Sequence, residues 1–323
     1  MELQDIYLHL RRDIEKIEQE LTHSIHTEQT TLQHAAHHLL KAGGKRMRPV
    51  FVLLSGRFGT YHLENISHVA VALELIHMAS LVHDDVIDNA RTRRGKETVK
   101  AKWSNQTAMY TGDFIFARAL QKIAQIKDSD VQAILSNAMM KMCEGEIEQI
   151  EDIFAPDQSL KRYLRRIKRK TALLMSVSCQ LGAIVSGARD RDVKALAKYG
   201  YYVGMAFQLT DDVLDLTGDE KVLGKPAGSD LRQGNITLPV TYALHHATEQ
   251  DQTKILTYIQ SKGTQGALNE VLDIVRTAGG IEETLQLSTR YLKKALHALA
   301  LLPDSLERQS LQLIGEFIVR RSY

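Results

Sequence analysis

The positions of five prolines constrain the fold of this 323-residue chain more than any other feature. Each proline lies where a helix can begin or in a connecting segment, and none interrupts a long apolar pattern with a period of 3.6 residues. An alternating apolar and polar pattern, which strands would require, has no useful length anywhere in the chain. The sequence therefore predicts an all-α protein. The prolines are Pro49, Pro156, Pro226, Pro239 and Pro303.

The helical pattern extends over most of the chain, with ends defined to within a few residues. The chain has no internal repeat, low-complexity tract or linker-like change of composition, so we expect a single domain over residues 1–323. A hydrophobic content of 44% is ample for a sizeable core. The expected helices are 2–22, 28–42, 49–58, 66–90, 105–126, 129–150, 159–187, 191–217, 237–247, 251–261, 265–277, 280–300 and 304–320.

Charge and cysteine content exclude several classes of protein. Lys and Arg number 41 against 39 Asp and Glu, so the net charge of +2 gives no global attraction for nucleic acid. Charges run throughout the N-terminal segment, so we expect neither a signal peptide nor a membrane span there, and at most peripheral membrane contact. The two cysteines, Cys143 and Cys179, lie in helical patterns that indicate burial. We therefore expect no disulfide scaffold and a cytoplasmic location.

Two acidic clusters share the spacing DDxxD, one in HDDVID and one in TDDVLD. If each lies on a helix, its first and last carboxylates are one turn apart on the same face. Carboxylates gathered around one space resist ionisation unless cations lie between them. Hard oxygen ligands favour Mg²⁺, so the pattern predicts a site for two or three magnesium ions. The clusters comprise Asp84, Asp85, Asp88, Asp211, Asp212 and Asp215.

Basic segments accompany both clusters. The segment GGKRMRP at 43–49 delivers three cations from a flexible turn, which suits a diphosphate but fits a basic loop without a ligand equally well. NARTRRGKETV directly follows the first cluster. These charges could neutralise one another on a surface, but a Mg²⁺-bound diphosphate between acids and bases would satisfy both. The Gly-rich segment 218–235, which carries Lys225, is a candidate lid or an ordinary solvated connection.

Several conspicuous basic residues have simpler interpretations. The seven cations of 161–170 are typical of a solvated helix face. Binding of RNA or lipid is a less favoured interpretation, because Tyr163 is the one aromatic residue in this segment. Lys170 precedes an apolar run and is expected to point inward. The cluster His34, His37 and His38 lacks a further ligand, which favours surface positions.

His77 lies seven residues before Asp84, on nearly the same face of a helix. It could donate to a phosphate, and a core histidine is an equally good interpretation. No Ser-His-Asp or Cys-His arrangement stands out, so covalent catalysis has no support in the sequence.

Taken together, these motifs resemble the trans-isoprenyl diphosphate synthases. GGKRMRP, LVHDDVIDNARTRRG, KTALL, FQLTDDVLDLTGDEKVLGKPAGSDLRQG and NITLP follow the family's order from about Leu39 to Tyr242. ELIHMASLVH, CEGEIEQI and YLRRIKRKTALL further resemble the catalytic subunits of two-component bacterial members. The resemblance implies a single-domain helical bundle of the isoprenoid synthase type, with a deep central cavity and the two DDxxD motifs facing across its mouth.

The resemblance also implies the reaction and the residue roles. Isopentenyl diphosphate would condense head to tail and repeatedly onto an allylic diphosphate, expected to be farnesyl diphosphate. The product would be a long all-trans polyprenyl diphosphate, expected to have seven units and to supply a menaquinone side chain. Catalytic roles would fall to Asp84, Asp88, Asp211, Lys170, Thr171 and Gln208. Isopentenyl diphosphate would contact Lys45, Arg48, His77 and Arg94. The allylic diphosphate would contact Arg93, Lys170 and Lys225, and Thr171 and Gln208 would line the path of the developing cation.

The chemical needs of the reaction and the length of the product both agree with this resemblance. Several cations in a site closed to water would stabilise the leaving diphosphate, so the reaction needs no side-chain base, and none stands out. Ala79 and Ser80, one turn before the first cluster, are small and would let the product pass. A chain of seven units extends roughly 30 Å, or about 20 residues of helix, which places the floor of the cavity around Val69 and Leu73 or in another chain.

One departure from the family pattern concerns Asn235, where many members have a lysine after the glycine. Asparagine donates a hydrogen bond but brings no charge, so one phosphate contact is missing. We therefore expect a weakly active chain that gains activity with a small non-catalytic second subunit. A homodimeric hexaprenyl or geranylgeranyl diphosphate synthase is the alternative within the class. A regulatory subunit or an RNA- or membrane-binding helical protein is the alternative outside it, although the intact DDxxD motifs argue against a regulatory role and no nucleic-acid partner is expected.

Overall fold

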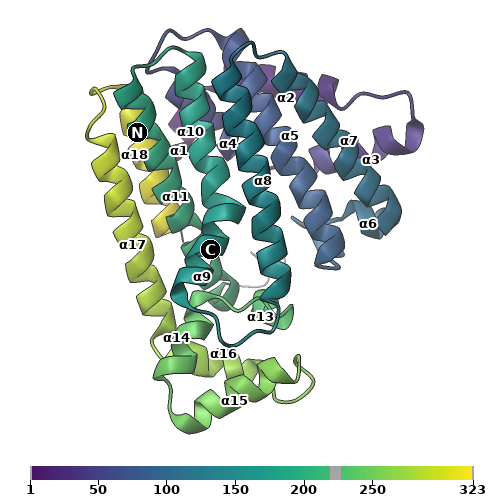
Figure 1. Cartoon of the computed structure of the whole chain (residues 1–323), viewed down its shortest axis with the longest axis vertical. Helices are drawn as coiled ribbons and strands as arrows, with labels where there is room; N and C mark the ends of the chain where they lie inside the picture. The colour runs from purple at the N-terminus through teal and green to yellow at the C-terminus, as the bar shows by residue number, and fades with distance from the viewer. Residues whose placement is uncertain (1, 219–226, 322–323) are drawn as a thin grey trace. The chain divides into compact units, whose positions relative to one another are not determined.

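The computed structural model describes residues 2–218 and 227–321, and these residues are almost entirely helical (Figure 1). The all-α prediction is therefore confirmed. Lys225 lies outside the described residues, as does the rest of segment 219–226 of the candidate lid. The helices before the second acidic cluster are α1 (Leu3–His9), α2 (Arg11–Ser24), α3 (Thr30–Lys41), α4 (Met47–Gly56), α5 (Leu63–Ile87), α6 (Val99–Lys102), α7 (Asn105–Ala124), α8 (Ser129–Glu151), α9 (Leu160–Ile167) and α10 (Leu173–Val185). The later helices are α11 (Asp190–Thr217), α13 (Ser229–Arg232), α14 (Leu238–His246), α15 (Glu249–Gln260), α16 (Leu268–Thr277), α17 (Gly280–Leu299) and α18 (Leu306–Arg320).

Contacts divide the chain into two compact units. That the whole chain acts as one domain stays a prediction. Unit 1 consists of Met1–Ser136, Val177–Ala197 and Leu301–Leu313. Unit 2 consists of Asn137–Ser176, Lys198–Ala300 and Ile314–Tyr323.

Helix α5 forms the core of unit 1. It packs along α7 and against α4 (Figure 1), and its apolar residues from Ile66 to Val82 are almost completely buried. By length and mean hydropathy α5 could cross a membrane, but 72% of its most apolar window is buried inside the protein. It is therefore best described as a core helix. Its carboxyl end carries the first acidic cluster, which a rigid and fully packed helix positions accurately.

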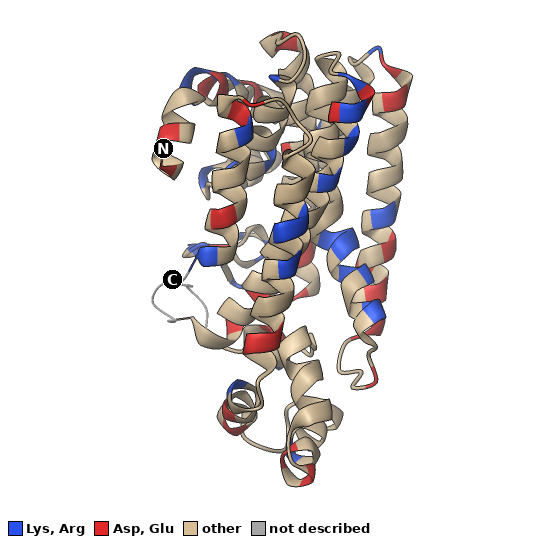
Figure 2. Ribbon diagram, turned by 90° about the vertical axis from the view of Figure 1, so that its left-hand side faces the viewer, with Lys and Arg blue, Asp and Glu red and all other residues tan. Residues whose placement is uncertain are grey.

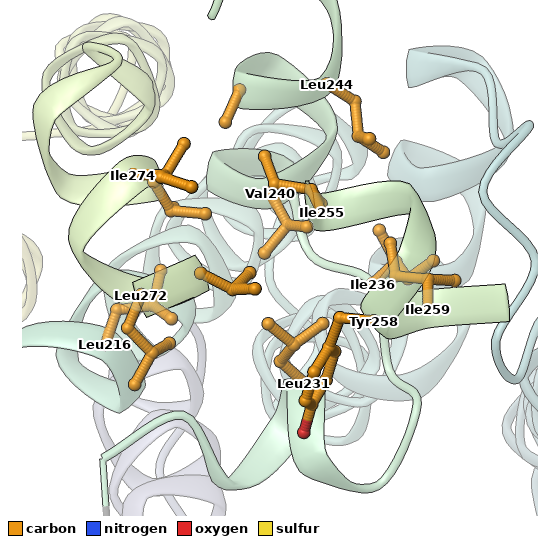
Figure 3. Packing of buried hydrophobic residues seen from close by; sticks show 13 residues of the cluster. Leu216, Leu231, Ile236, Val240, Leu244, Ile255, Tyr258, Ile259, Leu272 and Ile274 are labelled. Atoms are coloured by element: carbon orange, nitrogen blue, oxygen red, sulfur yellow. The ribbon is translucent and has the colours of Figure 1, made fainter. Parts of the chain in front are cut away.

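Unit 2 has a separate apolar cluster between α14, α15 and α16 (Figure 3). Val240 of α14, Ile255 of α15 and Val275 of α16 are fully buried in it. Leu216, near the end of α11, belongs to the same cluster. The helix that carries the second acidic cluster is therefore anchored just beyond the motif.

Local sequence explains where several helices begin. The Ser104 side chain accepts a hydrogen bond from the Thr107 amide at 3.0 Å and caps α7, and Ser159 caps α9 through the Arg162 amide at 3.2 Å. Pro239 lies in the first turn of α14, where its missing N–H has no cost.

The short helices α6 and α13 lie outside every expected range, and three further features differ from the expected helices. The expected helix 2–22 is broken at Leu10, which separates α1 from α2. The expected helix 159–187 contains a π-helical turn, Lys168–Ala172, between α9 and α10. A short antiparallel hairpin, β1 (Thr92–Arg93) and β2 (Lys96–Glu97), follows α5, and its strands are too short to give an alternating pattern.

Candidate active site

The first acidic cluster occupies the last turn of α5. Asp84 and Asp88 are half-buried, and Asp88 is the C-cap residue of the helix, one turn after Asp84. Asp85 is only 2% exposed. It accepts a hydrogen bond from Arg93 Nε at 2.9 Å and forms an ion pair with Arg93 Nη2 at 2.8 Å. Burial raises the pKa of Asp85, against the effect of the Arg93 guanidinium. The acidic cluster and the basic segment after it thus meet directly in unit 1.

The turn of the β1–β2 hairpin presents Arg94. Arg94 and Gly95 have φ values of 53° and 74°, the left-handed pair that a two-residue type I′ turn requires. Gly44 packs against the arginine, since a Cβ atom at Gly44 would lie 2.6 Å from Arg94 Nη1. The glycine therefore permits close approach of the GGKRMRP segment to the hairpin.

Four arginines act on His77 through their charges. Burial, followed by the charges of Arg48, Arg94, Arg93 and Arg46, holds the pKa of His77 well below its usual value. Burial likewise lowers the pKa of Arg48 to about 10, although Glu74 acts in the opposite direction. Arg48 Nε is buried and has no hydrogen-bond partner among the described residues. This excess of positive charge suits an anion, and it favours the phosphate interpretation of His77 over that of an ordinary core histidine.

The second acidic cluster lies on α11, in unit 2. Asp212 is 2% exposed and accepts hydrogen bonds from the Tyr163 hydroxyl at 2.5 Å and from Gln208 Nε2 at 2.9 Å. Gln208 Oε1 in turn accepts from the Thr171 hydroxyl at 2.7 Å. Burial raises the pKa of Asp212 to about 7, and Asp230 adds to this effect, whereas the hydrogen bonds oppose it. Three of the predicted site residues therefore form one hydrogen-bonded chain that ends on Tyr163.

The other two aspartates of this cluster have different partners. Asp211 forms an ion pair with Arg321, a nearly buried residue that also donates to the Phe207 carbonyl at 3.1 Å. Asp215 is buried, and its Oδ2 accepts from the backbone amide of Asp230 at 3.1 Å. The segment that begins at residue 227 is thereby tied to the end of α11.

Lys170 and Thr171 lie in the π-helical turn Lys168–Ala172. Such turns are rare, and they often occur at functional sites because they shift side chains relative to a regular helix. Lys170 is half-buried, as its apolar context predicted, and pairs with Glu146 of α8 at 3.0 Å.

The basic run 161–170 is paired with acids of unit 2. Arg165 and Arg169 contact Glu148 at 3.3 and 2.8 Å. Arg162 and Arg166 both contact Asp152, at 2.6 and 3.4 Å. Figure 2 likewise shows positive and negative segments interspersed along the helices. Because its charge is compensated, the run gives little support to RNA or lipid binding.

The residues expected to limit product length lie on α5. Val69, Leu73 and Ala79 are fully buried, and Ser80 is half-buried, with its hydroxyl donating to the His77 carbonyl at 2.9 Å. The helix begins at Leu63, close to the start that the length estimate required. Their role in setting product length stays a prediction.

The two aspartate clusters have the ligand chemistry that a hard cation such as Mg²⁺ requires. Each cluster supplies only carboxylate oxygens, and burial of Asp85 and Asp212 raises their pKa, a cost that a bound cation would offset. Within residues 2–218 and 227–321, however, no group of three or more His, Cys, Asp or Glu side chains is arranged to hold a metal ion. Asp85 and Asp211 are instead engaged by Arg93 and Arg321.

Sequence reasoning missed three residues that contact the candidate site. Tyr163 lies seven residues before Lys170, so helical spacing could have placed it near the site. Glu74 lies three residues before His77 and could have been found in the same way. Arg321 gives no such signal, because it is 110 residues away from Asp211 in the chain.

Comparison with known proteins gives the class of the chain. A family model described as polyprenyl synthetase matches residues 29–275. The chain belongs to this family and is a trans-prenyltransferase, which confirms the resemblance expected from the motifs.

Individual relatives narrow the comparison. The chain is 51% identical over 326 residues to heptaprenyl diphosphate synthase component 2 of Geobacillus stearothermophilus, covering 100% of both chains. The corresponding protein of Bacillus subtilis is 50% identical, covering 100% of this chain and 92% of the relative. A crystal structure of heptaprenyl diphosphate synthase from Staphylococcus aureus superposes with a TM-score of 0.91 at 42% identity, covering 97% and 98% of the two chains. A polyprenyl synthase from Caulobacter crescentus, complexed with calcium and isoprenyl diphosphate, superposes with a TM-score of 0.94 at 31% identity, covering 99% and 98%.

Proposed function

We propose that this trans-prenyltransferase makes heptaprenyl diphosphate, for a menaquinone side chain, by adding isopentenyl diphosphate repeatedly to farnesyl diphosphate. The observation that carries the residue assignment is the group of basic side chains around His77 in unit 1, joined to the first aspartate cluster by the Arg93–Asp85 ion pair. Anion-binding groups beside carboxylates are what a metal diphosphate requires.

Each unit has its own part in the proposed mechanism. In unit 1, Lys45, Arg48 and Arg94 bind the diphosphate of isopentenyl diphosphate, and neutral His77 donates a hydrogen bond to it. In unit 2, the hydrogen bonds from Tyr163 through Asp212 orient the amide of Gln208 and the hydroxyl of Thr171. These two side chains would line the path of the developing cation. The sequence motifs, and no geometry between the units, support Arg93, Lys170 and Lys225 as contacts of the allylic diphosphate, and Lys225 lies outside the described residues.

Two or three Mg²⁺ ions, when bound by the aspartate clusters, supply the positive charge that stabilises the departing diphosphate. Asp84, Asp88 and Asp211 are the proposed principal ligands. Asp85, Asp212 and Asp215, which are buried and hydrogen-bonded, support them. The sequence motifs support this division of roles.

We further propose that the chain acts with a small second subunit in the cytoplasm. The support is the name component 2 carried by two relatives that match over the whole chain. Cys143 and Cys179 are free thiols, as a reducing compartment allows. Cys179 is buried as expected, whereas the expected burial of Cys143 is wrong because its side chain is exposed on α8. A homodimeric synthase stays the alternative, and the oligomeric state of the active species separates the two.

Substitution of the proposed ligands tests the function. Asp84→Asn and Asp211→Asn should each lower Mg²⁺-dependent turnover by at least about a hundredfold, because each removes a charged ligand. Asp273→Asn is the matched control, since this aspartate is exposed and pairs with Arg276 on α16. Turnover that survives both motif substitutions would contradict the proposal.

A further inference from the structure

Arg46 lies in the middle of the GGKRMRP segment, between two of the proposed phosphate ligands, but its own side chain is used elsewhere. It is 9% exposed, and its guanidinium forms ion pairs with Glu18 of α2 and, at 3.1 Å, with Glu74 of α5. Its Nη2 also approaches the Leu40 carbonyl at 3.5 Å. An arginine whose fork is already shared between two carboxylates is poorly placed to bind a substrate phosphate.

The backbone of Arg46 is in a conformation that an arginine seldom adopts. Its φ and ψ are 47° and 38°, the left-handed region, and it is the N-cap residue of α4. Such a conformation costs free energy at a residue other than glycine and persists when the surroundings impose it. The two ion pairs hold the side chain from two different helices, which favours retention of this conformation.

The left-handed turn separates Lys45 from Arg48. Lys45 is exposed, and its carbonyl accepts a hydrogen bond from Tyr7 of α1 at 2.6 Å. Arg48, two residues after Arg46, lies in the first turn of α4, where it contributes to the charge around His77. The directions of both proposed ligands therefore depend on the turn at Arg46.

We propose that Arg46 is a positioning residue for the isopentenyl diphosphate site, acting through its ion pairs with Glu18 and Glu74 to hold Lys45 and Arg48 in place. This inference rests on the proposed function of the loop. It requires Arg46 itself to make no contact with the phosphate.

The test compares Arg46→Lys with Arg57→Lys. Lysine keeps the charge near the two carboxylates but cannot bind both with a planar fork. Arg57 is the C-cap residue of α4 and pairs with Asp13 of α2 at 2.9 Å, so the control removes a similar link between the same two helices at the other end of α4. Both variants thus replace a paired arginine by lysine, but only Arg46 lies within the GGKRMRP segment.

We expect Arg46→Lys to raise the KM for isopentenyl diphosphate about tenfold, since a hydrogen bond to a charged group is lost. The kcat and the KM for the allylic diphosphate should stay within about twofold. Calorimetry with inorganic diphosphate in the absence of Mg²⁺ should give a Kd that rises by the same factor. Arg57→Lys should leave all these values unchanged. If Arg46→Lys unfolds, Glu18→Gln serves in its place, because it alters one of the two partners at a half-exposed position. This variant should raise the KM for isopentenyl diphosphate and the Kd for inorganic diphosphate by a smaller factor.

Equal shifts in the two arginine variants, or no shift in Arg46→Lys, would overturn the proposal. A change in kcat without a change in diphosphate affinity would also overturn it. If wild-type protein binds inorganic diphosphate but makes no prenyl product, the proposed function fails. The comparison of Kd values then still decides the role of Arg46.

Discussion

Removal of the Tyr163 hydroxyl should expose how strongly the second aspartate cluster depends on its buried support. Tyr163 is 1% exposed and Asp212 is 2% exposed, and the hydroxyl donates to Asp212 Oδ2 at 2.5 Å. Arg166 lies over the Tyr163 ring, 5.7 Å from its centre, and donates to the Ile236 carbonyl at 2.7 Å. The tyrosine is therefore rigidly held, and Tyr163→Phe removes one oxygen without a change in packing.

The expected cost follows from this geometry. A hydrogen bond to a charged acceptor contributes about 1.5–3 kcal/mol, and its loss leaves Oδ2 buried without this donor. We therefore expect a loss of about 2 kcal/mol in the free energy of unfolding at pH 8. The loss should be smaller at pH 6, because the pKa of about 7 leaves Asp212 largely protonated there. The concentration of Mg²⁺ at half-maximal activity should rise as well, since Gln208 and Asp212 lose their fixed orientation.

The assay is thermal unfolding with a chelator at both pH values, followed by activity against Mg²⁺ concentration. A destabilisation of 1 kcal/mol should lower the Tm by roughly 1–2 °C for a chain of 323 residues. Tyr258→Phe is the control, because Tyr258 is also buried in unit 2 but belongs to the apolar cluster of α14–α16. Identical Tm values and Mg²⁺ dependence for the two variants would refute the reasoning.

Two further predictions concern the aspartate clusters. Burial raises the pKa of Asp212 above 3.8 to about 7, so the folded state binds the proton more tightly and the wild type loses stability as the pH rises through about 7. Without Mg²⁺, the Tm of Asp212→Asn minus the Tm of wild type should therefore increase as the pH rises from 5 to 8. A difference in Tm that does not change with pH would contradict the raised pKa of Asp212. Gly112→Ala would place a Cβ atom in the ring of His83, the residue before Asp84, and should cost about 1–3 kcal/mol of stability by thermal unfolding, with a higher requirement for Mg²⁺. Wild-type stability in that variant would show that the ring moves aside freely.

The sequence was most informative about the helices and the motifs. Prolines and the 3.6-residue period defined most helix positions, because these signals are local. The placement of the first cluster at the end of α5 followed directly, and Lys170 is half-buried. The all-α class and the family resemblance were predictable for the same reason.

Features that depend on contacts distant in sequence were not predictable. The break at Leu10 and the π-helical turn at 168–172 leave the apolar pattern almost unchanged, so the sequence read as continuous helix. The pairing of Arg169 with Glu144 and Glu148 depends on how α8 meets the basic run. Neither the Arg321–Asp211 contact nor the left-handed turn at Arg46 has a local signature, since packing imposes both.

The most direct test of the central claim is sizing of the product. The chain is incubated with farnesyl diphosphate and isopentenyl diphosphate, with and without Mg²⁺ and with and without the second component of a related heptaprenyl enzyme. We predict Mg²⁺-dependent formation of heptaprenyl diphosphate that increases strongly when the second component is present. Absence of any product longer than farnesyl diphosphate under all these conditions would contradict the account.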